Sequence, residues 1–175
     1  GTGGSGSRGS RPSDLPETIG GRYKISRLLG RGGQGFVCLA YDPNLAIEVA
    51  VKVLHPEYRE DEFVNRFKTE ARTAVRLTAP NIVRVYDFNA EVPYLVMEYC
   101  GEGDLNERIK RRHPMPLTES LGIIRQICQA LVAAHDNTPR ILHRDLKPGN
   151  VLFHHGVPKV ADFGLAKMVG SGTGQ

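Results

Sequence analysis

The chain has 175 residues, of which 40% are hydrophobic and 24% charged, so its composition excludes a disordered protein and predicts a globular one with a core. Its net charge of +4 comes from scattered basic residues, which suits anionic ligands such as phosphates but makes no nucleic-acid-binding patch. The three cysteines are widely spaced and the apolar runs are short, which excludes a disulfide framework, a zinc site and a membrane segment.

Both ends of the chain are rich in glycine and serine. Residues 1–20 and 170–175 offer little apolar surface to bury, so we expect both segments to be disordered and the fold to begin near Tyr23. The chain also lacks an initiator methionine, which suggests an excerpt of a longer protein. We expect the excerpt to be cytoplasmic, whereas the parent protein could carry a membrane anchor elsewhere.

The first half of the remaining chain is predicted to form an antiparallel sheet with one helix. Strands are expected at 23–29, 36–41, 47–54, 82–88 and 94–99. Between the third and fourth strands, apolar residues recur at helical spacing and predict an amphipathic helix over 61–77.

The second half is predicted to be mainly helical. Asp104 and Glu107 have capping-box spacing and open a short helix that ends near Pro114. A longer helix is expected over 118–134, and short strands follow at 151–153 and 159–161. The apolar stripe of this longer helix has no predicted neighbour to cover it, so we expect an exposed face capable of self-association: Leu121, Ile124, Ile127 and Leu131.

A glycine-rich loop, Gly30-Arg31-Gly32-Gly33-Gln34-Gly35, matches the pattern G-x-G-x-x-G. Such a loop lets backbone amides approach a phosphate closely. The pattern alone is weak, because glycine is frequent enough here to produce chance matches in the N-terminal tail. The loop lies between two predicted strands, which argues against a Rossmann site and leaves a hairpin folded over phosphates.

Lys52 lies inside an apolar strand, and the ordinary explanation is a lysine that extends its charge to solvent. Glu70 lies on the apolar face of the next helix, where a charge is costly unless it is paired. One buried cation and one buried anion would satisfy each other, so we expect Lys52 and Glu70 to form an ion pair.

The most specific stretch runs from His143 to Asn150 and is followed by Asp162-Phe163-Gly164. Its residues suit phosphoryl transfer, which depends on positioning and charge neutralisation. Asp145 would accept or orient a substrate hydroxyl proton, and Lys147 would neutralise the transferring group. Asn150 and Asp162 would supply hard oxygen ligands to Mg²⁺.

Together these motifs resemble the eukaryotic-type protein kinases, because G-x-G-x-x-G-x-V, V-A-V-K, H-R-D-L-K-P-x-N and D-F-G occur in the family's order. The first strands look especially like those of bacterial serine/threonine kinases. Lys147 belongs to the serine/threonine form of the third motif. The resemblance implies an α+β, two-lobed kinase fold, with a five-stranded antiparallel N-lobe at 21–100 and an incomplete, mainly helical C-lobe at 101–169.

The resemblance also implies a binding site for ATP. Lys52 would contact the phosphates while Glu70 anchors it, and Met97 would be the gatekeeper. Asp104 could reach the ribose, although its capping role would also explain it. The residues implied in ATP binding besides Lys52 are Leu29, Gly30, Arg31, Gly32, Gly33, Gln34, Gly35, Phe36, Val37, Ala50, Glu98, Cys100 and Leu152.

The family's chain continues past the D-F-G motif with an activation segment and supporting helices, which this sequence lacks. The function implied is ATP-dependent phosphoryl transfer to serine or threonine of protein substrates. The alternative is a truncated or pseudokinase-like nucleotide-binding module without phosphotransfer. We expect weak nucleotide binding and little activity from this chain.

Overall fold

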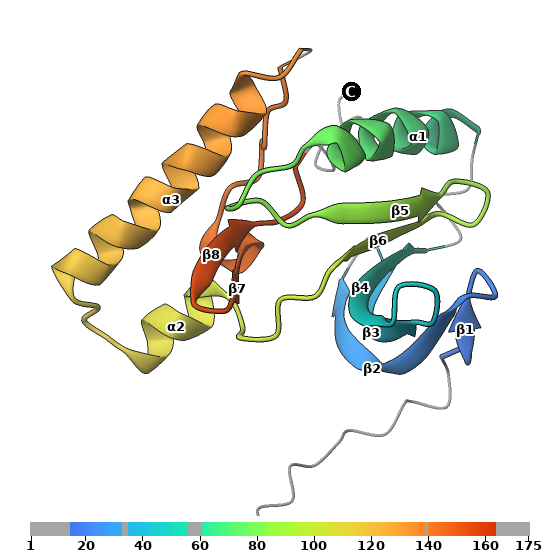
Figure 1. Cartoon of the computed structure of the whole chain (residues 1–175), viewed down its shortest axis with the longest axis horizontal. Helices are drawn as coiled ribbons and strands as arrows, with labels where there is room; N and C mark the ends of the chain where they lie inside the picture. The colour runs from blue at the N-terminus through green and yellow to red at the C-terminus, as the bar shows by residue number, and fades with distance from the viewer. Residues whose placement is uncertain (1–14, 33–34, 56–60, 139, 164–175) are drawn as a thin grey trace, which may run out of the picture.

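The computed structural model describes residues 15–32, 35–55, 61–138 and 140–163, without the side chains of residues 61, 62, 66 and 70. Its first part is a six-stranded sheet with the order β1-β2-β3-β4-β6-β5, in which all neighbours are antiparallel (Figure 1). The strands are β1 (Thr18–Ile19), β2 (Tyr23–Gly32), β3 (Gly35–Asp42), β4 (Ile47–Leu54), β5 (Val85–Asn89) and β6 (Tyr94–Glu98).

Each face of the sheet contributes to a separate apolar core. Alternate residues along a strand point to opposite faces, so neighbouring residues belong to different cores. On β4, Ala50 faces a core formed with helix α1 (Asp61–Arg76), which contributes Phe67 and Ala71. Val49 and Val51 face the opposite core. The predicted helix over 61–77 is therefore confirmed, and Figure 1 shows α1 lying along β5.

Residues 15–20, expected in the disordered tail, are instead part of the fold. Leu15 and Ile19 are 4% and 5% exposed and pack on the outer face of the sheet, where β1 pairs with β2. Two isolated apolar residues in a polar stretch gave no periodic signal, and only the tertiary contacts show their role. Residues 1–14 and the end segment 170–175 lie outside the described residues.

A partly buried ion pair joins Arg22, the residue before β2, to Asp42 at the end of β3. Asp42 is 1% exposed and accepts hydrogen bonds from Arg22 Nε at 3.0 Å and Nη2 at 2.6 Å, and from the Asn44 backbone N–H at 2.9 Å. The Arg22 hydrogen bond is the main reason that the pKa of the Asp42 carboxyl lies below its ordinary value.

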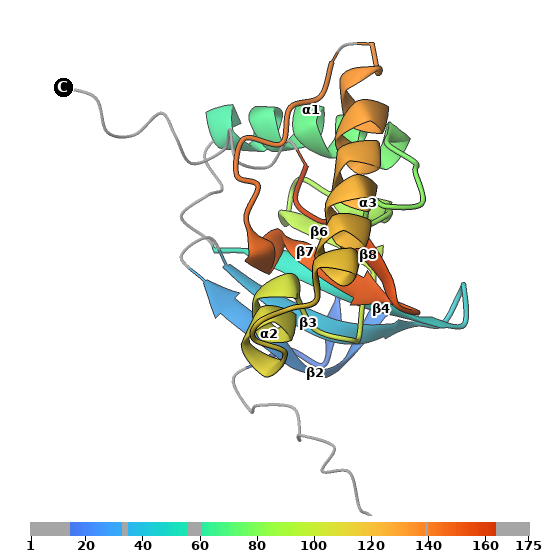
Figure 2. The same cartoon turned by 90° about the vertical axis from the view of Figure 1, so that its left-hand side faces the viewer.

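The second part contains the helices α2 (Leu105–Arg111) and α3 (Leu117–His135) and the hairpin β7 (Val151–His154) and β8 (Val157–Val160). Helix α3 lies beside β8 (Figure 2). A small apolar core that includes Ala130, Ala134 and Val160 joins them. Helix α3 matches its prediction to within one residue at each end, whereas α2 ends at Arg111, three residues before the predicted Pro114. No helix in the described ranges is long and apolar enough to cross a membrane.

The fourth predicted strand differs from the observed one. It was expected over 82–88, but β5 begins only at Val85. Ile82 instead bridges Val160, and the neighbouring backbone bonds, Val83 N–H to Val160 O at 2.9 Å and Val160 N–H to Asn81 O at 2.8 Å, attach β8 to this segment. The segment therefore connects the two parts of the fold.

The stripe predicted on the longer helix divides in the structure. Leu121 and Ile124 are 56% and 54% exposed, as expected. Ile127 and Leu131 are partly buried against the core beneath α3, because neighbouring Ala130 and Ala134 let the helix approach β8 closely. The exposed apolar side chains of α3 thus differ from the predicted stripe, because Leu117 and Val132 are also exposed, at 72% and 57%.

Candidate active site

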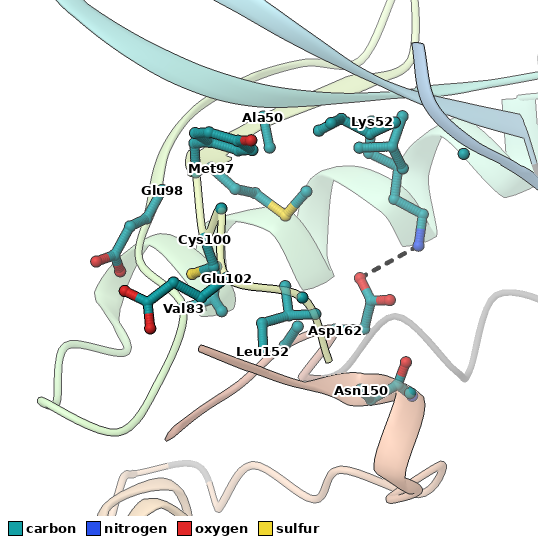
Figure 3. A pocket seen from close by; sticks show the side chains of 18 of the residues that line it. Ala50, Lys52, Val83, Met97, Glu98, Cys100, Glu102, Asn150, Leu152 and Asp162 are labelled. Atoms are coloured by element: carbon teal, nitrogen blue, oxygen red, sulfur yellow. Dashed lines mark hydrogen bonds and ion pairs between the residues drawn. The ribbon is translucent and has the colours of Figure 1, made fainter. Parts of the chain in front are cut away.

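A cleft of about 670 Å³ lies between the sheet and the β7–β8 hairpin (Figure 3). Its upper wall comes from β2, β3 and β4, and its floor comes from the hairpin. Its back is formed by residues 98–103, at the end of β6 and after it. Val37 and Ala50 above and Leu152 below give the cleft apolar surface on two opposite sides, which suits a flat, weakly polar ring. The predicted residues that line it are Leu29, Gly30, Val37, Ala50, Lys52, Met97, Glu98, Cys100, Asn150, Leu152 and Asp162.

A second hollow of about 370 Å³ adjoins this cleft, and a larger share of its lining residues is polar or charged. The two share Gly30, Val37, Lys52, Asn150 and Asp162. The second hollow also brings the glycine-rich loop opposite the predicted catalytic loop, through Arg31, Gly32, Gly35, Asp145 and Lys147. A ligand with an apolar ring and an anionic tail would fit with its ring in the first cleft and its tail in the second hollow.

Lys52 faces the hollows from the middle of β4, where it is paired with Val37 on β3 and Leu95 on β6. Its Nζ lies 3.2 Å from Asp162 Oδ1, and its side chain is 13% exposed (Figure 3). Glu70 lies in α1, but its side chain is outside the described residues, so the Lys52–Glu70 pair stays a prediction. The observed partner is Asp162.

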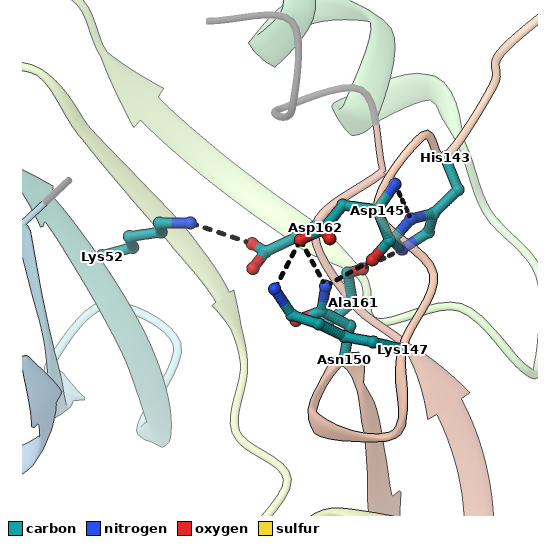
Figure 4. Close-up of polar contacts among 7 residues, drawn as sticks. All are labelled: Lys52, His143, Asp145, Lys147, Asn150, Ala161 and Asp162. Atoms are coloured by element: carbon teal, nitrogen blue, oxygen red, sulfur yellow. Dashed lines mark hydrogen bonds and ion pairs between the residues drawn. The ribbon is translucent and has the colours of Figure 1, made fainter. Parts of the chain in front are cut away.

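The predicted catalytic loop is held together by hydrogen bonds among its own polar residues (Figure 4). Lys147 Nζ donates to Asp145 Oδ2 at 2.7 Å, and Asn150 Nδ2 donates to the Asp145 backbone oxygen at 2.8 Å. The bond from Lys147 is the main cause of a lowered pKa at Asp145. Asp145 therefore presents an ionised, half-exposed carboxylate at neutral pH.

His143 connects this loop to the segment that carries Asp162, a role that the sequence did not reveal. Its buried ring bonds through Nε2 to the Ala161 backbone oxygen at 2.7 Å and accepts the Asp145 backbone N–H at Nδ1, 3.3 Å away. Because Nδ1 accepts, Nε2 carries the proton in this arrangement. The Phe163 ring packs edge-on against the His143 ring, with 4.8 Å between the ring centroids.

Two residues of the site have left-handed backbone conformations, Arg144 with φ of 64° and Asp162 with φ of 61°. Such conformations cost side-chain-bearing residues on the order of 1 kcal/mol each and persist where surrounding contacts enforce them. At Asp162 the turn accompanies the ion pair with Lys52.

The structure does not bring every predicted residue into the clefts. Phe36 packs with the core on the outer face of the sheet, because Val37 next to it faces the cleft. Asp104 accepts the Glu107 backbone N–H at 2.8 Å as the N-cap of α2, and Glu107 lines the cleft in its place. Gly33 and Gln34 fall outside the described residues.

The sequence also missed several residues at the mouth and back of the first cleft: Arg27, Val83, Tyr99, Glu102, Glu107 and Ala161. Arg27 was detectable, because it lies two residues before Leu29 on the same face of β2. Its guanidinium donates to the Tyr99 hydroxyl at 2.9 Å. Burial, assisted by nearby Glu98, raises the pKa of the Cys100 thiol to about 12, so this cysteine is a poor nucleophile at neutral pH.

Comparison with known proteins gives a consistent result. The family model for the protein kinase domain matches residues 23–174. The serine/threonine-protein kinase PrkC of Bacillus subtilis is 45% identical over 163 residues, which cover 91% of this chain and 25% of that protein. PknA of Mycobacterium tuberculosis is 42% identical over 161 residues, covering 87% and 37%.

Solved structures agree with the sequence matches. The PknI kinase domain of Mycobacterium tuberculosis superimposes with a TM-score of 0.74 at 31% identity, covering 86% of this chain and 61% of that one. The described fold is therefore similar to a kinase domain, and the chain spans only about a quarter to a little over a third of the curated relatives named above.

Proposed function

This chain belongs to the protein kinase domain family, and we propose that it transfers the terminal phosphoryl group of ATP to serine or threonine hydroxyls of proteins. The observation that carries the proposal is the meeting of Lys52, Asp145, Asn150 and Asp162 around two adjoining hollows. A module that only binds nucleotide would need Lys52 and the apolar cleft but not the Asp145–Lys147 arrangement. Phosphoryl transfer is therefore favoured over nucleotide binding alone.

In the proposed reaction, the purine ring of ATP occupies the apolar cleft and its phosphates extend under the glycine-rich loop toward Lys52. A substrate hydroxyl lies against Asp145, whose carboxylate orients it and receives its proton. The hydroxyl oxygen forms a bond to the terminal phosphorus as the bond to the bridging oxygen breaks, and ADP leaves. Lys147, 2.7 Å from Asp145, adds positive charge beside the transferring group.

The residues present fit a magnesium ion that accompanies ATP. Asn150 and Asp162 both line the two hollows and offer an amide oxygen and a carboxylate, the ligands that Mg²⁺ prefers. Among the described residues, no cluster of three or more His, Cys, Asp or Glu could hold a metal unaided. When bound together with ATP, the ion would neutralise phosphate charge.

The experiment that tests the proposal combines the purified protein with Mg²⁺, ATP labelled in its terminal phosphate, and peptides that differ only in carrying serine, threonine or tyrosine. We expect label in the serine and threonine peptides, at the low level that the sequence predicts for this chain, and a weakened dependence on Mg²⁺ in Asp162→Asn. Nucleotide binding without any transfer would favour the binding module instead. If the protein binds no adenine nucleotide, both candidate functions are wrong.

Two finer proposals accompany this function. We propose a cytoplasmic location for this part of the protein, since the substrate ATP is abundant there. We also propose self-association through α3, which is supported by the exposed Leu121 and Ile124 side chains. Sedimentation of the protein with and without Leu121→Ser tests the second.

A further inference from the structure

Glu98, the last residue of β6, makes side-chain contacts that its predicted role in adenine binding does not require. Its Oε2 lies 3.0 Å from Lys159 Nζ and accepts the Arg84 backbone N–H at 3.2 Å. Its Oε1 lies 3.9 Å from His154 Nε2. The side chains of Glu98 and Lys159 are each only 14% exposed, so this ion pair is well shielded from water.

The ion pair joins two walls of the nucleotide cleft. Lys159 on β8 is the cross-strand partner of Leu152 on β7, so their side chains project from the same face of the hairpin. Leu152 forms the floor of the cleft, and the segment after Glu98 forms its back (Figure 3). Lys159 itself does not line the cleft, and no motif marked it in the sequence.

The segment behind the cleft is anchored to the hairpin at its other end as well. There the Phe153 N–H donates to the Gly103 oxygen at 3.0 Å, and the Gly156 N–H donates to Glu102 Oε2 at 3.0 Å. Between these anchors, Tyr99, Cys100 and Gly101 line the cleft. The Glu98–Lys159 pair is thus the anchor at the sheet end.

We propose that the Glu98–Lys159 ion pair presets the spacing between the back and the floor of the cleft, and thereby the affinity for the adenine end of the nucleotide. Lys159 is a positioning residue that acts through Leu152 and the segment after Glu98. The inference rests on the proposed nucleotide site. Without the pair, the segment keeps its anchors to the hairpin at the Gly103 end, and at the Glu98 end it keeps the longer contact with His154. Binding must then fix a spacing that the pair had fixed beforehand.

The test measures binding of adenosine, ADP and Mg-ATP by calorimetry to the wild-type protein, Lys159→Met, Glu98→Gln and the double variant. Glu98→Gln retains an acceptor for the Arg84 N–H and removes only the charge. We expect each variant to lose affinity about threefold to tenfold, by the same factor for all three ligands, because the lost order is at the adenine end. The double variant should lose no more than the worse single one.

Lys159→Arg, which keeps the charge, should bind within about twofold of wild type. The matched control is Arg112→Gln, which breaks a 3.0 Å ion pair with Glu119 between α2 and α3, away from both hollows. Thermal unfolding of each variant ensures that binding is compared among folded proteins.

The outcomes separate this inference from the proposed function. If the wild-type protein binds adenosine and the Lys159→Met and Glu98→Gln variants bind it equally well, the inference is overturned while the nucleotide site stands. The inference is also overturned if the losses of affinity add up in the double variant, or if Lys159→Arg loses as much affinity as Lys159→Met. If the wild-type protein binds none of the three ligands, it is the proposed function that fails.

Discussion

Replacing Lys52 by methionine should reduce phosphoryl transfer far more than it reduces nucleotide affinity. Methionine preserves the length and apolar stem of the side chain but removes its charge. In the structure that charge already has a partner, because Nζ lies 3.2 Å from Asp162 Oδ1. The substitution therefore affects both an existing ion pair and the interaction proposed with the phosphates.

The two effects differ in size for a structural reason. On binding, Lys52 exchanges contact with the Asp162 carboxylate for contact with phosphate, one anion for another, so its net contribution to affinity is small. We expect the dissociation constant of Mg-ATP to rise by no more than about tenfold, the low end of the range for a hydrogen bond to a charged group. Losing one prearranged cation beside the reacting group costs about 10²–10³ in rate.

The assay compares kcat for label transfer with the dissociation constants of Mg-ATP and adenosine in Lys52→Met. Adenosine has no phosphates, so its affinity should be unchanged. Lys24→Met, an exposed lysine on β2, is the matched control. Unchanged phosphoryl transfer in Lys52→Met, or an equal loss of affinity for adenosine and Mg-ATP, would refute this reasoning.

Four other outcomes are expected. Asp145→Asn should lower kcat about 10²–10⁴-fold with nucleotide affinity nearly intact in the same assay, because Asp145 acts on the hydroxyl. Asp42→Asn should lower the unfolding free energy by about 1–3 kcal/mol at pH 7, where the Asp42 carboxylate is ionised and hydrogen-bonded to the 32% exposed Arg22. The pKa of Asp42 is lowered in the fold, so this stabilisation is present above its unfolded value near 4 and is lost as the pH falls through the folded value; the difference from wild type in urea melts should shrink by pH 3. Gly35→Ala should destabilise the protein by about 1–3 kcal/mol in the same melts, because φ is 154° and a Cβ would collide with the Val53 carbonyl oxygen. A maleimide should label exposed Cys128 well before Cys100, as mass spectrometry of peptides would show.

The elements that the sequence predicted are those whose signal is local. Helix α1 follows from apolar residues at steps of three and four, and Asp104 caps α2 as its spacing with Glu107 indicated. The motif residues could be located by pattern and resemblance, and the structure brings Lys52, Asp145, Asn150 and Asp162 together. Their chemistry depends on residue type at fixed spacing, which a sequence displays directly.

The features that the sequence missed depend on contacts between distant residues. Leu15 is buried only because a sheet face lies beneath it, and Ile82 leaves β5 because Val160 offers another partner. Phe36 was placed at the ATP site by resemblance, although strand alternation beside Val37 already predicted the opposite face. Lys159 has an ordinary sequence context, and its pairing with Glu98 across 61 positions could not be read from either residue alone.

The Lys52–Asp162 pair has a consequence for which form of the nucleotide this site accepts. In the structure the two charges balance each other at 3.2 Å. If Lys52 turns toward phosphate, the Asp162 carboxylate, which is 32% exposed, loses its cation and faces added negative charge. That arrangement is unfavourable unless a cation arrives together with the phosphates. A nucleotide that brings its own divalent ion restores the balance at Asp162, whereas a metal-free nucleotide must compete with Asp162 for Lys52. We therefore expect the proposed site to bind the metal-bound nucleotide more tightly than the metal-free one.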